Sequence, residues 1–176
     1  MRRLLPLILL AACSDAKDPA TDAPPHTGSD APAHLDTPPA DALGDAGPLR
    51  ILVVNEVVAS GDPDWFEVVN ATTSPVELSD FIFVDEKDNF TKAVPFPQMT
   101  LAPGAYYAQD CDGTIVPFKL ASDEEIWVYR GSDDLLSDGV DWAEGDSPEG
   151  SSFARIPDIF GDFQTVTPPT KGLPNQ

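Results

Sequence analysis

From Leu49 onward, the chain consists of short runs of β-branched and aromatic residues separated by Gly, Pro, Asp and Asn. Turn residues recur roughly every 8–12 positions, and no segment shows a sustained 3.6-residue apolar period. This pattern predicts an all-β sandwich or barrel. Strands are expected at residues 51–59, 64–70, 75–79, 81–85, 106–109, 116–120, 125–130, 140–143 and 153–156, with turns at residues 62–64, 102–104 and 112–113.

Apolar and polar positions alternate in the second expected strand. Phe66 and Val68 share one face of that strand, and Trp65, Glu67 and Val69 share the other.

Two acidic residues, Glu56 and Glu67, lie within otherwise apolar strands. Buried charges are generally paired, because a lone buried charge costs several kcal/mol. Arg155 is one of few basic residues available, so we expect it to bond a strand carboxylate, with Glu67 as the preferred partner.

The first residues predict export and anchoring. Arg2 and Arg3 precede an apolar run at residues 4–10, and small residues then lead to Cys13. The run is too short to span a bilayer, which takes roughly 20 residues, and the order is that of a signal peptide. A cysteine at this place resembles the lipobox of bacterial lipoproteins, which implies lipidation of Cys13; an ordinary signal peptide with an incidental cysteine is the alternative. Ser14 fits the pattern of lipoproteins sent to the outer membrane.

Composition divides the rest of the chain in two. Residues 14–48 contain seven prolines, eight alanines and seven aspartates but no Phe, Trp or Tyr. Such a segment buries too little apolar surface to offset the entropy of ordering, which predicts a disordered tether. The expected organisation is a signal peptide at 1–12, a lipidated cysteine and tether at 13–48, and one β-sandwich domain at 49–176.

The chain is strongly acidic. Removal of residues 1–12 leaves 30 acidic against 8 basic side chains, a net charge of −22. A field of that sign repels nucleic-acid phosphates, so no nucleic-acid partner is expected.

The chain offers little catalytic chemistry. Both histidines, His26 and His34, lie in the expected tether, so the domain lacks the usual general base and the usual zinc ligand. With Cys13 lipidated, Cys111 has no disulfide partner, and we expect it to be a buried, unreactive thiol next to Asp110 and Asp112. No catalytic, cofactor or metal site is therefore predicted.

Several carboxylate and aromatic side chains are candidate contacts for a ligand. Residues 110–113 resemble the start of a calcium loop, but position twelve of that loop would be Ala121 rather than glutamate. Other carboxylates that could supply oxygen ligands are Asp80, Asp85, Glu86, Asp88, Asp133, Asp134 and Asp138. Three tryptophans could stack on sugar rings, although core or packing roles are favoured for them: Trp65, Trp127 and Trp142.

Seven motifs resemble those of the lamin-tail domain, a compact immunoglobulin-like β-sandwich. They lie at residues 54–57 (V-N-E-V), 64–70 (D-W-F-E-V-V-N), 76–81 (V-E-L-S-D-F), 101–106 (L-A-P-G-A-Y), 118–120 (F-K-L), 152–158 (S-F-A-R-I-P-D) and 170–175 (T-K-G-L-P-N). Phe81 stands where the family has tryptophan or tyrosine, and Lys171 where it has proline. The asparagines Asn55, Asn70 and Asn175 are expected to tie loops to backbone groups.

The resemblance implies a module rather than an enzyme. We therefore expect a lipoprotein of the bacterial cell envelope, held at the outer membrane by Cys13 and facing the periplasm or the cell surface. Its domain would act as a binding or adaptor module for a protein or carbohydrate ligand. A structural envelope protein without a specific ligand, and an accessory domain that recruits a hydrolase in trans, are the alternatives.

Overall fold

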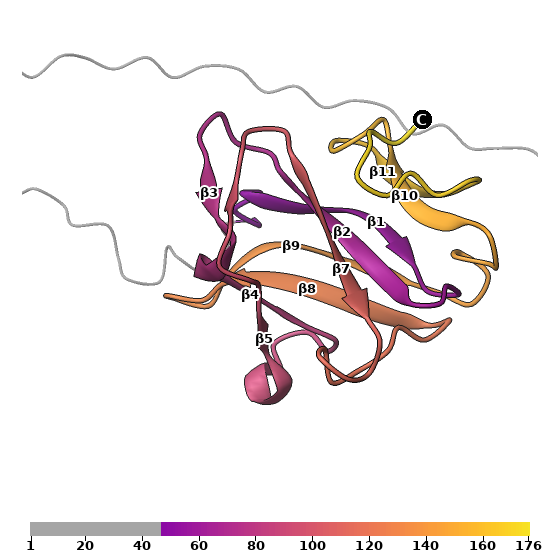
Figure 1. Cartoon of the computed structure of the whole chain (residues 1–176), viewed down its shortest axis with the longest axis horizontal. Helices are drawn as coiled ribbons and strands as arrows, with labels where there is room; N and C mark the ends of the chain where they lie inside the picture. The colour runs from indigo at the N-terminus through magenta and orange to yellow at the C-terminus, as the bar shows by residue number, and fades with distance from the viewer. Residues whose placement is uncertain (1–46) are drawn as a thin grey trace, which may run out of the picture. The chain divides into compact units, whose positions relative to one another are not determined.

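Two antiparallel sheets and one short ribbon make up the part of the chain that the computed structural model describes, residues 47–176 (Figure 1). The larger sheet has the order β11-β10-β1-β2-β7, the smaller has the order β5-β4-β8-β9, and β3 pairs with β6. The bounds are β1 Leu52–Val58, β2 Asp64–Asn70, β3 Val76–Glu77, β4 Phe81–Val84, β5 Val94–Pro95, β6 Thr100–Leu101, β7 Tyr106–Cys111, β8 Glu124–Arg130, β9 Leu135–Trp142, β10 Ser152–Ile156 and β11 Asp162–Val166, with single 3-10 turns η2 at Leu78–Asp80 and η3 at Phe90–Lys92.

The two sheets pack face to face, as Figure 1 shows for β8 and β9 beneath β1, β2 and β7. Their inner faces meet in one apolar core, to which β2 contributes Phe66 and Val68. The ring of Phe66 lies edge-on to that of Phe83 of β4, with 5.0 Å between ring centroids. Aromatic pairs prefer this geometry because the ring edge is positive and the face negative. The predicted all-β sandwich is thereby confirmed.

Most of the expected strands are present, and the prediction of one strand is wrong. Residues 116–120 form no strand, yet Val116, Phe118 and Leu120 are buried in the core. Their alternation arises because an irregular segment inserts every second side chain between the sheets, without pairing its backbone in a ladder. The short strands β5 and β6, the strand β11 and the first half of β9 were not expected from the sequence.

A β-bulge shapes strand β1. The register with β2 shifts between Val54, which faces Val68, and Glu56, which faces Glu67, so Asn55 is the extra residue. A bulge re-aims the side chains that follow it. As a result, even-numbered residues of β1 point into the core before the bulge and odd-numbered ones after it, and Glu56 lies opposite Glu67 on the outer face.

The outer face of β1 and β2 is not open to solvent, because residues 170–175 lie across it. The backbone N–H groups of Thr170 and Gly172 donate to Glu56 and Glu67. Lys171 places its ammonium over the Trp65 ring, 4.9 Å from the centroid. This cover explains why all seven residues of each strand are buried.

Within residues 47–176, no helix is long and apolar enough to cross a membrane.

Candidate functional site

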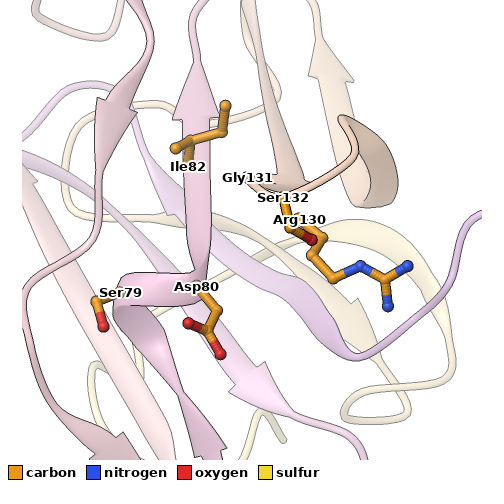
Figure 2. A pocket seen from close by; sticks show the side chains of 6 residues that line it. All are labelled: Ser79, Asp80, Ile82, Arg130, Gly131 and Ser132. Carbon is orange, nitrogen blue, oxygen red and sulfur yellow. The ribbon is translucent and has the colours of Figure 1, made fainter.

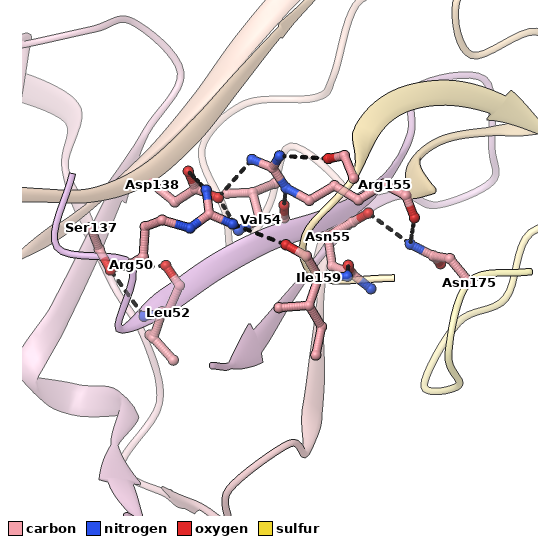
Figure 3. A network of polar contacts seen from close by, with 10 residues as sticks. Arg50, Leu52, Val54, Asn55, Ser137, Asp138, Arg155, Ile159 and Asn175 are labelled. Carbon is pink, nitrogen blue, oxygen red and sulfur yellow. Dashed lines mark hydrogen bonds and ion pairs between the residues drawn. The ribbon is translucent and has the colours of Figure 1, made fainter. Parts of the chain in front are cut away.

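The two sheets are joined along β1 by polar side chains (Figure 3). Strand β10 pairs with β1 only near Glu56 and Val57, so the first half of β1 has backbone groups that face no strand on that side. Side chains of β9 take the place of the missing strand. Ser137 Oγ accepts the N–H of Leu52 at 2.9 Å, and Asp138 Oδ2 accepts the N–H of Val54 at 3.0 Å. A bulge in β9 at this point lets the consecutive side chains of Ser137 and Asp138 both reach β1.

Arg155 completes this edge and corrects the expectation about its partner. Its Nε donates to the carbonyl oxygen of Val54 at 2.8 Å, and its Nη2 to Asp138 Oδ2 at 2.9 Å. The arginine therefore bonds a strand carboxylate, as predicted, but that carboxylate is Asp138 and not Glu67. The physical reason is the side of the sheet on which each carboxylate lies: Glu67 is on the outer face of β2, whereas Asp138 reaches the edge of β1, where Arg155 bonds Val54.

Asp138 lies between two guanidinium groups. Arg155 Nη2 bonds its Oδ2, and Arg50 Nη1 approaches its Oδ1 at 3.5 Å. The Asp138 side chain is only 5% exposed, and burial raises the pKa of this carboxyl although both arginines act to lower it. The aspartate is thus a structural anchor, and its oxygens are already bonded to Val54, Arg155 and Arg50.

A second polar cluster adjoins the first and centres on Asp158, in the turn after β10. Its Oδ1 accepts from Asn55 Nδ2 at 3.0 Å and from the N–H of Asn175 at 2.9 Å, and its Oδ2 accepts the Tyr106 hydroxyl at 2.6 Å. Burial and the neighbouring carboxylate raise the pKa of Tyr106. The cluster connects β1, β7 and two loops.

The turn that carries Asp158 is strained. Ile159 has a φ of +67°, a conformation that β-branched residues rarely adopt. Two bonds hold it there: its N–H donates to Asn55 Oδ1 at 2.9 Å, and its carbonyl accepts from Arg50 Nη2 at 2.9 Å. The strain is therefore offset by bonds to the two clusters.

Several polar residues of the lamin-tail-like motifs belong to these two clusters, and others bond loops nearby. Asn175 Nδ2 donates to the carbonyls of Asn55 and Arg155, and Asn70 Nδ2 ties Ser74 and Leu101 to the end of β2. The asparagines therefore do tie loops to backbone groups, as predicted. Because these side chains bond one another and the backbone inside the domain, their chemistry is that of a scaffold.

A shallow hollow of about 450 Å³ lies at one end of the smaller sheet (Figure 2). It is open to solvent and offers hydroxyl, carboxylate and guanidinium groups. In Figure 2 the guanidinium of Arg130 extends away from Asp80, and it pairs with Asp133 at 2.6 Å. Such groups suit hydrogen bonding to a polar ligand. The lining residues are Ser79, Asp80, Ile82, Arg130, Gly131 and Ser132.

The other candidate carboxylates do not gather around one point. Across residues 47–176, no three His, Cys, Asp or Glu side chains are placed to hold a metal ion together. Asp112 caps its own turn through Thr114, Asp88 accepts the Tyr129 hydroxyl at 2.9 Å, and Asp110 pairs with Lys171 at 2.6 Å. These carboxylates serve local structure.

The three tryptophans have different surroundings. Trp142 is a core residue, 1% exposed, and its indole N–H donates to the carbonyl of Ala121. Trp65 is buried beneath Lys171. Trp127 is half-buried, with Lys87 above its ring and Gly139 below it, where a Cβ atom would come within 2.1 Å of the ring. Trp142 is therefore a core residue and Trp127 a packing residue on Gly139, both within the expected core or packing roles.

Cys111 is fully buried, as expected. Burial and the negative charges of Asp64, Asp110, Glu124 and Asp112 raise its pKa to about 12. Cys13, His26 and His34 lie outside the described residues.

We predict that Cys111 is inert toward thiol reagents in the folded protein. A pKa raised from 9.0 to about 12 leaves roughly a thousandfold less thiolate at neutral pH, and burial blocks access as well. The measurement is the rate of labelling by a chromogenic disulfide in a Cys13→Ser chain, in which Cys111 is the single thiol. Denaturant should restore the rate of a free cysteine. Rapid labelling without denaturant would contradict the burial of this thiol.

The sequence did not reveal the role of Ser137. Its hydroxyl both accepts from the N–H of Leu52 and donates to the carbonyl of Leu52, at 2.9 and 2.8 Å. This role depends on the bulge in β9 and on Leu52, which lies 85 positions earlier in the chain. No pattern in the neighbouring sequence predicts either feature.

The chain was compared with models of known protein families, with curated proteins and with solved structures. None of them matched. The resemblance to lamin-tail domains therefore stays a prediction that rests on the sequence motifs.

Proposed function

We propose that the chain is an envelope lipoprotein that displays a lamin-tail-like immunoglobulin sandwich as a binding or adaptor module. The observation that carries the proposal is the convergence of the motif residues. Asn55, Tyr106, Asp158 and Asn175 come from four motifs up to 120 positions apart and share one internal cluster. Motif residues that bond one another within the domain stabilise its fold. The surface side chains are then not needed for these bonds and can contact a ligand.

The strand order supports the immunoglobulin-like part of the proposal. Strands β1, β2 and β7 adjoin one another in one sheet, and β4, β8 and β9 in the other. In chain order these are the positions of strands A, B and E, and of C, F and G, in an immunoglobulin sandwich. The hairpin β10–β11 extends the first sheet beyond the A position.

The anchor is supported by the sequence before residue 15. A membrane-held domain with a net charge of −16, from 7 basic and 23 acidic residues at positions 49–176, favours a neutral or cationic partner over a nucleic acid. The hollow at Asp80 and Arg130 is the surface that we assign to first contact with a polar ligand.

Proximity labelling in intact cells tests this function. The full chain should enrich a defined partner, and an Asp80→Asn, Ser132→Ala double variant should lose it, whereas the exposed control Asp141→Asn should keep it. Enrichment of bulk envelope material alone would favour the structural alternative. Enrichment of one hydrolase would favour the accessory alternative.

We predict that the protein has no hydrolytic activity of its own. The polar clusters are committed to structural bonds, so the expected result in esterase, phosphatase, nuclease, protease and glycosidase assays is the rate of a blank, with or without calcium. Turnover that disappears when a pair of carboxylates is replaced would contradict this proposal.

A further inference from the structure

Two glutamates face each other on neighbouring strands beneath residues 170–175, a segment named here the C-terminal loop. Glu56 of β1 and Glu67 of β2 are cross-strand partners, and each is 0% exposed. Side chains at such positions have Cβ atoms roughly 4.5–5.5 Å apart, and like charges directly opposite each other are destabilising. The sheet therefore holds two carboxyl groups together out of contact with water.

Their hydrogen bonds are unequal. Glu56 accepts from the Ser152 hydroxyl at 2.5 Å, from the Thr170 N–H at 2.8 Å and from the Thr170 hydroxyl at 3.0 Å. Glu67 accepts from the N–H of Gly172 through Oε2, while its Oε1 is buried without any partner. A buried carboxyl with an unbonded oxygen is much more costly to hold as an anion than as a neutral acid, because burial penalises the charged form.

No cation compensates the pair within residues 47–176. The four ion pairs found there involve neither glutamate: Arg50 and Arg155 bond Asp138, Arg130 bonds Asp133, and Lys171 bonds Asp110. The titratable and charged groups that face Glu67 from the packed elements are Glu56 of β1, Tyr106 of β7 and Asp158 of the turn after β10, with Lys171 of the C-terminal loop directed to Trp65 and Asp110.

These surroundings favour the neutral form of Glu67. Burial is the largest cause, and the charges of Glu56 and Asp158 add to it, whereas the N–H of Gly172 and the amide of Asn55 act in the opposite direction. Together they raise the pKa of Glu67 to about 7. With a proton on Oε1, the charge that burial penalises is removed, and Oε2 stays free to accept from Gly172.

We propose that the C-terminal loop is a proton-dependent latch that lies closed over β1 and β2 while Glu67 is protonated and opens when Glu67 ionises. The loop is what excludes water from this carboxyl, through the bonds of Thr170 and Gly172. Opening hydrates Glu67 and relieves its repulsion by Glu56. The latch adds a response to pH that does not depend on which ligand the domain binds.

The sign of the effect follows from linkage. The pKa of Glu67 is higher in the closed state, about 7, than its ordinary value of 4.5, so the closed state binds the proton more tightly. Its advantage is complete at acidic pH below the ordinary pKa and is lost as pH rises through about 7. At alkaline pH the ratio of closed to open states is lower on the order of a hundredfold.

Amide hydrogen exchange of the full chain, followed at Gly172, tests the latch. The protection factor, corrected for the intrinsic pH dependence of exchange, should fall at least tenfold between pH 5.5 and pH 8.5. Protection of the Val128 amide in the opposite sheet should stay constant. The variant Glu67→Gln keeps an acceptor for Gly172 but cannot ionise, so its protection should not depend on pH, whereas the exposed control Glu149→Gln should behave as the parent does.

A constant protection factor in the parent, or an equal fall in Glu67→Gln, would overturn the latch. If Glu67→Gln does not fold, the carboxyl carbon of Glu67 in the parent can be titrated by NMR. A midpoint near neutral pH supports the proposal, and a midpoint near 4.5 refutes it.

Discussion

The Cys13→Ser chain is expected to leave the membrane fraction and appear in the soluble fraction, or to stay unprocessed. Each buried methylene of an acyl chain contributes about 0.8 kcal/mol, and stable anchoring needs more than one chain. A lipidated, N-acylated cysteine meets that need, and serine offers no thiol for the lipid. Fractionation and metabolic labelling with a radioactive fatty acid measure the two consequences, location and lipidation.

The matched control for this experiment is Cys111→Ser. The chain has two cysteines, and Cys111 is fully buried in the sandwich, so its replacement should leave fatty-acid labelling unchanged. Fatty-acid label that persists in Cys13→Ser, or equal membrane partition of a processed Cys13→Ser chain and its parent, would rule out the lipoprotein assignment.

Arg155→Met is expected to destabilise the domain by about 3–5 kcal/mol, the usual cost of removing one partner of a buried ion pair. The substitution leaves Asp138 with only the more distant Arg50, and it leaves the carbonyl of Val54 without its donor. Methionine retains most of the volume of the arginine stem, so little of the loss is due to a cavity. Chemical denaturation of the full chain, monitored by tryptophan fluorescence, gives the change in free energy of unfolding.

The surface pair Arg130–Asp133 is the control for that prediction. Both side chains are about one-third exposed or more, so solvent screens the pair and Arg130→Met should cost much less than Arg155→Met. In a double-mutant cycle, Asp138→Asn combined with Arg155→Met should cost less than the two single substitutions added together, because no unpaired charge then stays buried. Equal losses of unfolding free energy for Arg130→Met and Arg155→Met would show that the buried ion pair contributes no more to stability than the exposed one.

The strands were predictable where they bury one apolar face against the core. Asp64–Asn70 was expected with the bounds that it has, because its aromatic and β-branched residues form one run that turn residues precede. Strand β11 was not expected, because it lies at a sheet edge and has only two half-buried side chains, Phe163 and Val166. At residues 116–120 the same period-2 pattern belongs to a loop, so the pattern reports burial rather than ladder pairing.

The polar clusters were predictable in membership but not in pairing. Glu56, Glu67 and Arg155 stood out as charges within apolar strands, and the asparagines as loop ties. Which carboxylate meets the arginine depends on the side of the sheet on which each one lies, and a one-residue bulge at Asn55 moves Glu56 to the outer face. A bulge has no reliable local signature, and Asp138 could be read only as one of many surface acids until β9 was placed beside β1.

The long reach of the polar clusters has a consequence for the order in which the chain folds. Strand β1 is synthesised early. Its backbone and side chains nevertheless bond Ser152, Thr170 and Asn175, which come 96 to 120 positions later in the chain. Domains dominated by such distant contacts fold slowly, on the order of milliseconds to seconds. The sandwich therefore closes after synthesis has passed residue 175, and until then β1 lacks the bonds that its backbone and side chains make with these later residues.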